Sequence, residues 1–190
     1  MVRTGPSKIP LEGFQLCRRR LLQLAFVGTA TAVAGPALAV APTRRLAMRN
    51  LHTDEWAEAT YWSDGRYVPK ALARINVLLR DHRREEVHPI APSLLDLLHR
   101  LAQAIGTEEP FHVVSGYRSP QTNAMLGSKS SAVAKRSFHM RGQAVDIRLP
   151  CCGLQRLHRL ALALDAGGVG LYRRSNFIHV DVGPVRQWVG

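Results

Sequence analysis

The sequence predicts an α+β fold in which a small, mainly antiparallel sheet carries helices packed on one face. Two observations support this prediction. Apolar residues recur at helical spacing in two segments of the first half, and four short strand-like segments with only two further helices follow. This order lacks the regular strand–helix alternation of a parallel doubly wound sheet. With 190 residues, of which 46% are hydrophobic, the chain has room for one ordinary domain.

Four helices are expected from apolar spacing and start signals. The first two begin near Pro69 and Pro92, because proline is well tolerated in the first turn of a helix. The second carries an apolar stripe that ends near Gly106, formed by Leu94, Leu97, Leu98, Leu101 and Ile105. Shorter helices are expected at residues 119–126 and 154–164, and strands at residues 111–115, 143–149, 168–172 and 177–182.

The N-terminus has the features of an export signal. Arg18 to Arg20 precede an apolar run at residues 21–34, which ends in the small-residue pattern Ala37-Leu38-Ala39. Because the run is short for a membrane span, we expect a cleaved signal peptide over residues 1–39 and no stable membrane span afterwards. The paired arginines favour the twin-arginine route. An ordinary secretory signal is the alternative, since Cys17 precedes the pair and no phenylalanine follows it.

Residues 40–68 are interpreted as a lead-in to a domain at residues 69–190. The part up to Asn50 is basic and contains Pro42, so we expect it to be poorly ordered. Aromatic residues follow around a Ser63-Asp64-Gly65 turn signal, and packing is the more common role for such residues.

The formal net charge of +12 is compatible with a nucleic acid, a membrane surface or an acidic polymer as partner, and charge alone does not choose among them. Removal of residues 1–39 leaves the chain basic. In the cell envelope we expect acidic wall peptides rather than nucleic acid as partners. Of the three cysteines, Cys17 lies in the predicted signal and Cys151 and Cys152 are neighbours, so no disulfide framework is implied.

A histidine and an aspartate lie seven positions apart around the start of a predicted strand. His139 falls in a glycine-containing loop, and Asp146 lies on the less apolar face of the strand at residues 143–149. In the last strand, His179 and Asp181 lie opposite the apolar face in the same way. If the two strands are neighbours, Asp146 and His179 point into one cleft.

Two imidazoles and a carboxylate suit a catalytic zinc ion, because three protein ligands leave the fourth position for water. Zinc lowers the pKa of such a water to about 7, which makes it a nucleophile near neutral pH. His139, Asp146 and His179 are therefore candidate ligands. The alternative is structural: a histidine that caps a turn, a histidine bonded within its strand, and an aspartate paired with an arginine.

Three motifs in order extend this pattern: Gly116-Tyr117-Arg118-Ser119, then Ser137-x-His139-x-x-Gly142-x-Ala144-x-Asp146, then His179-Val180-Asp181. Over residues 111–188 they resemble the zinc peptidases that include D-Ala-D-Ala carboxypeptidases and dipeptidases, L-Ala-D-Glu endolysins and the hedgehog signalling domain, particularly the exported bacterial branch with a twin-arginine signal. The resemblance implies a central antiparallel sheet and one zinc ion held by His139, Asp146 and His179. It further implies a periplasmic or envelope enzyme that hydrolyses peptide bonds in peptidoglycan stem peptides or cross-links.

The resemblance also implies a role for Arg118, which matches an arginine that binds the scissile carbonyl or its developing oxyanion. A guanidinium suits this role because it stays charged and its donors are fixed in a plane. A turn arginine bonded to backbone carbonyls is the alternative.

One position departs from the family pattern. Many members place a catalytic glutamate three residues before the last zinc histidine, and here that residue is Asn176, whose amide cannot accept a proton. Asp181 is the remaining candidate, either as the base or as a partner that orients a ligand. A zinc-containing but non-catalytic module that binds the cell wall or a protein partner is therefore the alternative function.

Overall fold

The computed structural model describes residues 42–130 and 133–190, so the predicted signal peptide at residues 1–39 lies outside the described residues. The described chain forms four α-helices, one 3₁₀ turn and eight strands in one sheet of order β3-β2-β1-β4-β5-β7-β6-β8. The strands are β1 (Arg44–Asn50), β2 (Trp56–Ser63), β3 (Arg66–Tyr67), β4 (Phe111–Ser115), β5 (Ala144–Arg148), β6 (Gly168–Tyr172), β7 (Phe177–Asp181) and β8 (Arg186–Val189).

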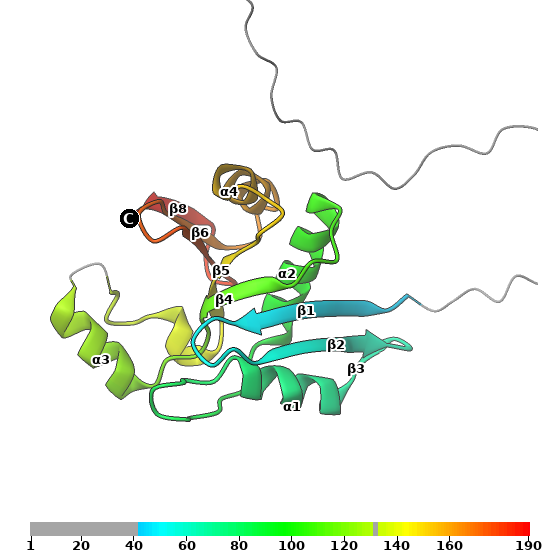
Figure 1. The fold of residues 1–190 in the computed structure, drawn as a ribbon, viewed down its shortest axis with the longest axis horizontal. Helices are drawn as coiled ribbons and strands as arrows, with labels where there is room; N and C mark the ends of the chain where they lie inside the picture. Colours follow the sequence, from blue (N-terminus) through cyan, green and yellow to red (C-terminus); the bar gives the residue numbers. More distant parts are fainter. Residues whose placement is uncertain (1–41, 131–132) are drawn as a thin grey trace, which may run out of the picture. The chain divides into compact units, whose positions relative to one another are not determined.

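The sheet is mixed but mainly antiparallel, as predicted. Five neighbouring pairs are antiparallel, and only β1 with β4 and β6 with β8 run parallel. Figure 1 shows β1, β2 and β4 side by side. The four strands predicted from the sequence correspond to β4, β5, β6 and β7.

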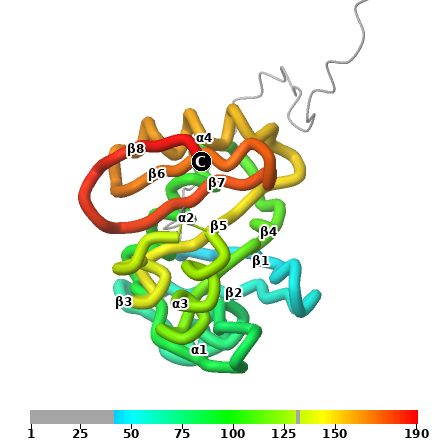
Figure 2. Tube along the Cα trace, turned by 90° about the vertical axis from the view of Figure 1, so that its left-hand side faces the viewer, coloured from blue at the N-terminus to red at the C-terminus, as the bar shows by residue number. Residues whose placement is uncertain are grey.

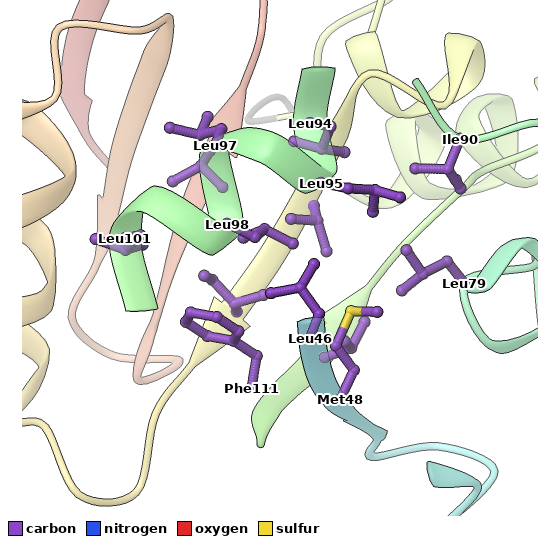
Figure 3. Close-up of a cluster of buried hydrophobic side chains, with 14 of the residues drawn as sticks. Leu46, Met48, Leu79, Ile90, Leu94, Leu95, Leu97, Leu98, Leu101 and Phe111 are labelled. Atoms are coloured by element: carbon purple, nitrogen blue, oxygen red, sulfur yellow. The ribbon is translucent and has the colours of Figure 1, made fainter. Parts of the chain in front are cut away.

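Helices α1 (Pro69–Leu78), α2 (Pro92–Ile105) and α4 (Leu154–Ala163) share one apolar core with the sheet. Figure 2 shows α4 beside β6 and β8 at one end of the sheet and α1 near β2 at the other. The leucines of α2 pack on Leu46, Met48 and Phe111 between these ends (Figure 3). The predicted α+β fold with helices on one face of the sheet is thus confirmed. Among the described helices, none is long and apolar enough to cross a bilayer.

The stretch from residue 44 is part of the sheet, so the expectation of a poorly ordered lead-in is wrong from Arg44 onward. In β1, Leu46 and Met48 are buried in the core while Arg45 and Arg49 face outward. In β2 the buried positions alternate in the same way. Apolar residues at outward positions, Ala47 in β1 and Trp56 in β2, obscure in the sequence the period of two that is the signature of a half-buried strand.

The remaining helix, α3 (Pro120–Lys129), contributes no residue to the main apolar core. It begins where the chain leaves β4, and the side chain of Ser119 caps its first turn by accepting a hydrogen bond from the Thr122 amide. Residues 116–119 therefore form a fixed turn between β4 and α3. This turn contributes to the candidate site.

Candidate metal centre

His139 is held by a single 3₁₀ turn, η1 (Phe138–Arg141), that leads into β5. The Ser137 hydroxyl caps this turn by accepting from the His139 amide at 3.3 Å. Gly142 ends the turn with φ +62°, and a Cβ there would collide with the Pro89 carbonyl. The Nδ1 atom of His139 lies 2.7 Å from the Gly116 carbonyl oxygen, so Nδ1 carries the proton and Nε2 is left as an acceptor. The turn thus presents a lone pair to the centre.

Asp146 and His179 come from neighbouring strands and face away from the apolar core. They are direct partners in the antiparallel register of β5 and β7. Their side chains therefore lie on the same face, as the alternation in both strands predicted. His179 Nδ1 lies 2.9 Å from Asp146 Oδ1 and 3.2 Å from His139 Nε2.

The three candidate ligands converge on one point. One donor atom from each of His139, Asp146 and His179 lies within 4.8 Å of the other two, and all three residues are buried. The third distance, from His139 Nε2 to Asp146 Oδ1, is 3.3 Å. A tetrahedral ion with bonds of about 2.0–2.1 Å separates its ligands by about 3.4 Å. The donor atoms therefore fit a metal ion with little movement.

The charges of this cluster suit a cation. Burial alone raises the pKa of Asp146, but its interactions with His139, its hydrogen bond with His179 and the charge of Arg118 outweigh burial and hold that pKa well below its usual range. Burial lowers the pKa of His139 and so favours the neutral imidazole. Burial lowers the pKa of His179, but its hydrogen bonds with Asp146 and Asp181 outweigh burial and raise it. The centre therefore offers an ionised carboxylate and a neutral His139, and binding of a metal would release the proton of His179.

Asp181 lies behind His179 rather than in front of it. Its Oδ2 atom is 2.9 Å from His179 Nε2, while His179 Nδ1 faces the centre. Asp181 is fully buried and also accepts from the Gly168 amide, the Gly183 amide and both terminal nitrogens of Arg186. A carboxylate so surrounded by donors is placed to orient an imidazole.

Arg118 contacts the centre through the other oxygen of Asp146. Its Nη2 donates to Asp146 Oδ2 at 2.6 Å and its Nε donates to the Ser115 hydroxyl at 2.9 Å. Among the described residues, no acceptor is bonded to Nη1, and the side chain lines the cleft of the centre. The guanidinium is thus bonded to a carboxylate and a hydroxyl, not to the backbone carbonyls considered in the sequence analysis.

A buried carboxylate that the sequence analysis missed fixes the turn carrying Arg118. Asp81 Oδ2 accepts from the backbone amide of Ser119 at 2.9 Å and from its hydroxyl at 2.7 Å. The Tyr117 amide donates to the Leu79 carbonyl at 2.7 Å. Because Gly116 and Arg118 both contact the centre, residues 79–81 set its geometry indirectly. No local pattern around Asp81 indicates this role.

Asn176 does not reach the centre. It lies in the turn between β6 and β7 with φ +51°, and it lines a separate cavity of about 380 Å³ with His112, Arg148 and Cys152. Asn176, three residues before His179, therefore lines a different cavity from the one that contains the candidate centre. The amide neither replaces a base nor blocks the centre.

The centre opens into a cleft of about 950 Å³. Four cationic side chains line it, and Asp146 is the only acid among its described lining residues; the cations are Arg118, Lys135, Arg136 and Arg186. Aromatic rings form much of the remaining wall, from Phe138, Tyr172, Phe177 and Trp188. Apart from Arg118, the sequence analysis missed these lining residues. Its one available signal was the alternation of Arg186 and Trp188 after the Gly183-Pro184 turn, which forms the unpredicted strand β8.

The buried His-Asp-His cluster on this sheet can hold a metal ion, as the centre of a metallopeptidase does. A family model described as Peptidoglycan L,D-endopeptidase MepK matches residues 38–188, and the chain belongs to this family. The chain is 41% identical over 182 residues to the peptidoglycan L,D-endopeptidase MepK of Escherichia coli strain K12, covering 94% of this chain and 100% of that protein. It is 38% identical over 148 residues to the probable peptidoglycan L,D-endopeptidase MepK of Haemophilus influenzae, covering 77% and 80%. The predicted family resemblance is confirmed.

Proposed function

We propose that this chain is a zinc-dependent peptidase that hydrolyses peptide bonds in the stem peptides or cross-links of peptidoglycan. The observation that carries the proposal is the convergence of His139, Asp146 and His179 in a basic cleft. The names of the relatives supply the substrate class. A cleft lined by four cations suits wall peptides, because these carry free carboxylates.

Zinc is the metal that we assign to the centre. Two imidazole nitrogens and one carboxylate oxygen at these separations match a catalytic zinc site with an open fourth position. When bound, zinc supplies a Lewis acid for the scissile carbonyl and lowers the pKa of a water ligand. Gly116 and Asp181 each hydrogen-bond the nitrogen of one histidine that faces away from the centre. These bonds hold the two imidazole rings in the orientation that metal binding needs.

We assign Arg118 to the scissile carbonyl and its developing negative charge. Nη2 is bonded to Asp146, while Nη1 has no acceptor among the described residues and remains for the substrate. Donors held near a developing oxyanion need no reorganisation during the reaction.

We assign Asp181 to orienting His179 and not to proton transfer. Five hydrogen bonds surround its two oxygens, and the imidazole of His179 lies between it and the centre. Of the described residues that line the cleft, Asp146 is the only carboxylate. The described lining therefore offers no carboxylate base apart from this candidate metal ligand, whose lowered pKa makes it a poor proton acceptor.

The decisive experiment digests purified sacculi and soluble muropeptides with zinc-loaded protein lacking residues 1–39. Fragment release should stop with a chelator, return with zinc, and be absent in His139→Ala. His158→Ala is the matched control, because His158 lies on α4 away from the centre and should leave release unchanged. Zinc and sacculus binding without release from cross-linked or uncross-linked substrates would instead support the non-catalytic module.

We also propose that the protein acts in the periplasm or cell envelope after export through residues 1–39. The arginine run and the Ala37-Leu38-Ala39 pattern support this. Protein recovered from the periplasm should begin at Val40. Replacement of Arg18 and Arg19 by lysine should stop export if the twin-arginine route is used and leave it nearly unchanged if the general secretory route is used.

A further inference from the structure

Arg186 is held rigidly in the wall of the cleft. Its Nη1 and Nη2 donate to the two oxygens of Asp181 at 3.0 and 2.6 Å, and Nη1 also donates to the Pro184 carbonyl at 3.0 Å. The guanidinium carbon lies 5.0 Å from the ring centre of Phe138 and 5.1 Å from that of Trp188. Two aromatic rings and a bidentate carboxylate fix the plane of the group.

The neighbouring strand is shaped to admit this arginine. A Cβ at Gly168 on β6 would collide with the guanidinium of Arg186 and the carboxylate of Asp181. A larger residue there would displace both groups, so glycine leaves space for the charged pair. The arrangement is therefore part of the sheet and not a chance contact of a surface side chain.

One edge of this guanidinium is left without a partner. The guanidinium of an arginine has five N–H groups, and three of those on Arg186 are hydrogen-bonded. The N–H of Nε and the second N–H of Nη2 have no acceptor among the described residues. These two donors lie side by side on one edge, which matches the two oxygens of a carboxylate. The side chain is 39% exposed and lines the cleft, so the edge is accessible.

We propose that Arg186 binds a free carboxylate of the substrate, on a residue near the scissile bond. The class of substrate is then a wall peptide that carries a carboxylate, and not a carboxamide, at that position. Arg186 contacts Asp181, which contacts His179, so the anchored group lies close to the metal centre. This inference rests on the proposed function for its substrate, but the recognition itself does not require turnover.

The test compares two muropeptides that are otherwise identical. The first, the acid, has free carboxylates, and in the second, the amide, these carboxylates are amidated. Wild-type protein should cleave the acid with a kcat/KM about ten- to hundredfold higher, because hydrogen bonds to a charged group are lost in the amide. Arg186→Gln should bring this ratio close to one, mainly by raising KM for the acid. Arg174→Gln, which removes an exposed charge outside the cleft lining, should keep the wild-type ratio.

The ratio separates recognition from structure. Loss of support for Asp181 in Arg186→Gln would slow both substrates equally and leave the ratio unchanged, which would overturn the proposal. The proposal would also be overturned if Arg136→Gln, and not Arg186→Gln, abolishes the preference for the acid. The wild-type comparison needs no variant, so equal rates on the acid and the amide would overturn the proposal even if Arg186→Gln does not fold.

Binding titrations of the same peptide pair to metal-free protein distinguish this inference from the proposed function. A preference for the acid that Arg186→Gln removes would support carboxylate recognition even if no peptide bond is cleaved. Equal affinity of the wild type for acid and amide would overturn the inference, whether or not the protein is a peptidase.

Discussion

Asp146 on β5 and His179 on β7 are direct cross-strand partners, and Oδ1 of the first lies 2.9 Å from Nδ1 of the second. Each strand puts its apolar residues into the core on the opposite face. A shift of one residue in either strand would turn the ligand into the core. The register that buries the core therefore also brings the candidate metal ligands together.

Metal should stabilise the folded protein through this pair. We expect zinc at about 100 times its dissociation constant to raise the free energy of unfolding by about 2.7 kcal/mol, because the unfolded chain lacks the assembled site. Calorimetry with and without a chelator measures this. In His179→Ala the difference should vanish, and an unchanged difference would contradict the assigned ligand set.

Asp181→Asn should weaken metal binding or activity about 10- to 100-fold, because the amide no longer orients His179 as a charged acceptor. Competition titrations with a zinc indicator and initial rates measure the two effects. Asp165→Asn, at an exposed turn, is the control. A thousandfold loss of rate with full zinc occupancy would make Asp181 the general base and refute its orienting role.

Arg118→Ala should lower kcat about 10²- to 10³-fold with a smaller change in KM, because the lost donors act on charge that develops in the transition state. Steady-state kinetics on a soluble muropeptide test this. Arg118→Lys should recover only part of the rate, since an ammonium cannot bond Asp146, Ser115 and the substrate in one plane. A change confined to KM would assign Arg118 to ground-state binding.

Asp81→Asn should disturb the metal centre from a distance. The neutral amide is a weaker acceptor than the carboxylate for the amide and the hydroxyl of Ser119, and its NH2 group cannot accept at all. The substitution should lower the free energy of unfolding by about 1–3 kcal/mol. Asp96→Asn is the matched control, because Asp96 also accepts several hydrogen bonds, from Arg44, Tyr61 and Tyr67, but lies outside the centre. Both variants should melt earlier, whereas only Asp81→Asn should lower zinc affinity. Equal zinc affinity in both would confine Asp81 to a stabilising role.

Acid should destabilise the protein partly through the same two carboxylates. Burial opposes ionisation of Asp96, but its hydrogen bonds with Arg44, Tyr67 and Tyr61 outweigh burial and lower its pKa below the ordinary value of 3.8. Hydrogen bonds from Thr122, Ser119 and the backbone likewise lower the pKa of Asp81 against burial. Their contribution is complete above pH 3.8 and is lost as the pH falls through the lowered values.

Urea titrations of the metal-free protein between pH 3 and pH 7 measure this loss. The free energy of unfolding of Asp96→Asn should depend less steeply on pH below about 4 than that of the wild type, since one carboxylate no longer titrates. An identical slope in the two proteins would mean that Asp96 has the same pKa folded and unfolded.

The sequence by itself determined the helices, the four central strands and the face on which each candidate ligand lies. Periodicity carries this information, since a residue two positions from an apolar core residue in a strand shares its face and a neighbour does not. The alternation in β5 and β7 therefore sufficed to place Asp146 and His179 opposite the core. The three linked motifs sufficed for the family.

Only the tertiary structure decided which strands are neighbours and which side chains share a hydrogen bond. It placed β7 between β5 and β6, drew residues 44–50 into the sheet, and directed Asn176 into another cavity. It also put Asp181 behind His179 and left one edge of Arg186 facing no protein acceptor among the described residues. These contacts join residues far apart in the chain or depend on rotamers, and local spacing specifies neither.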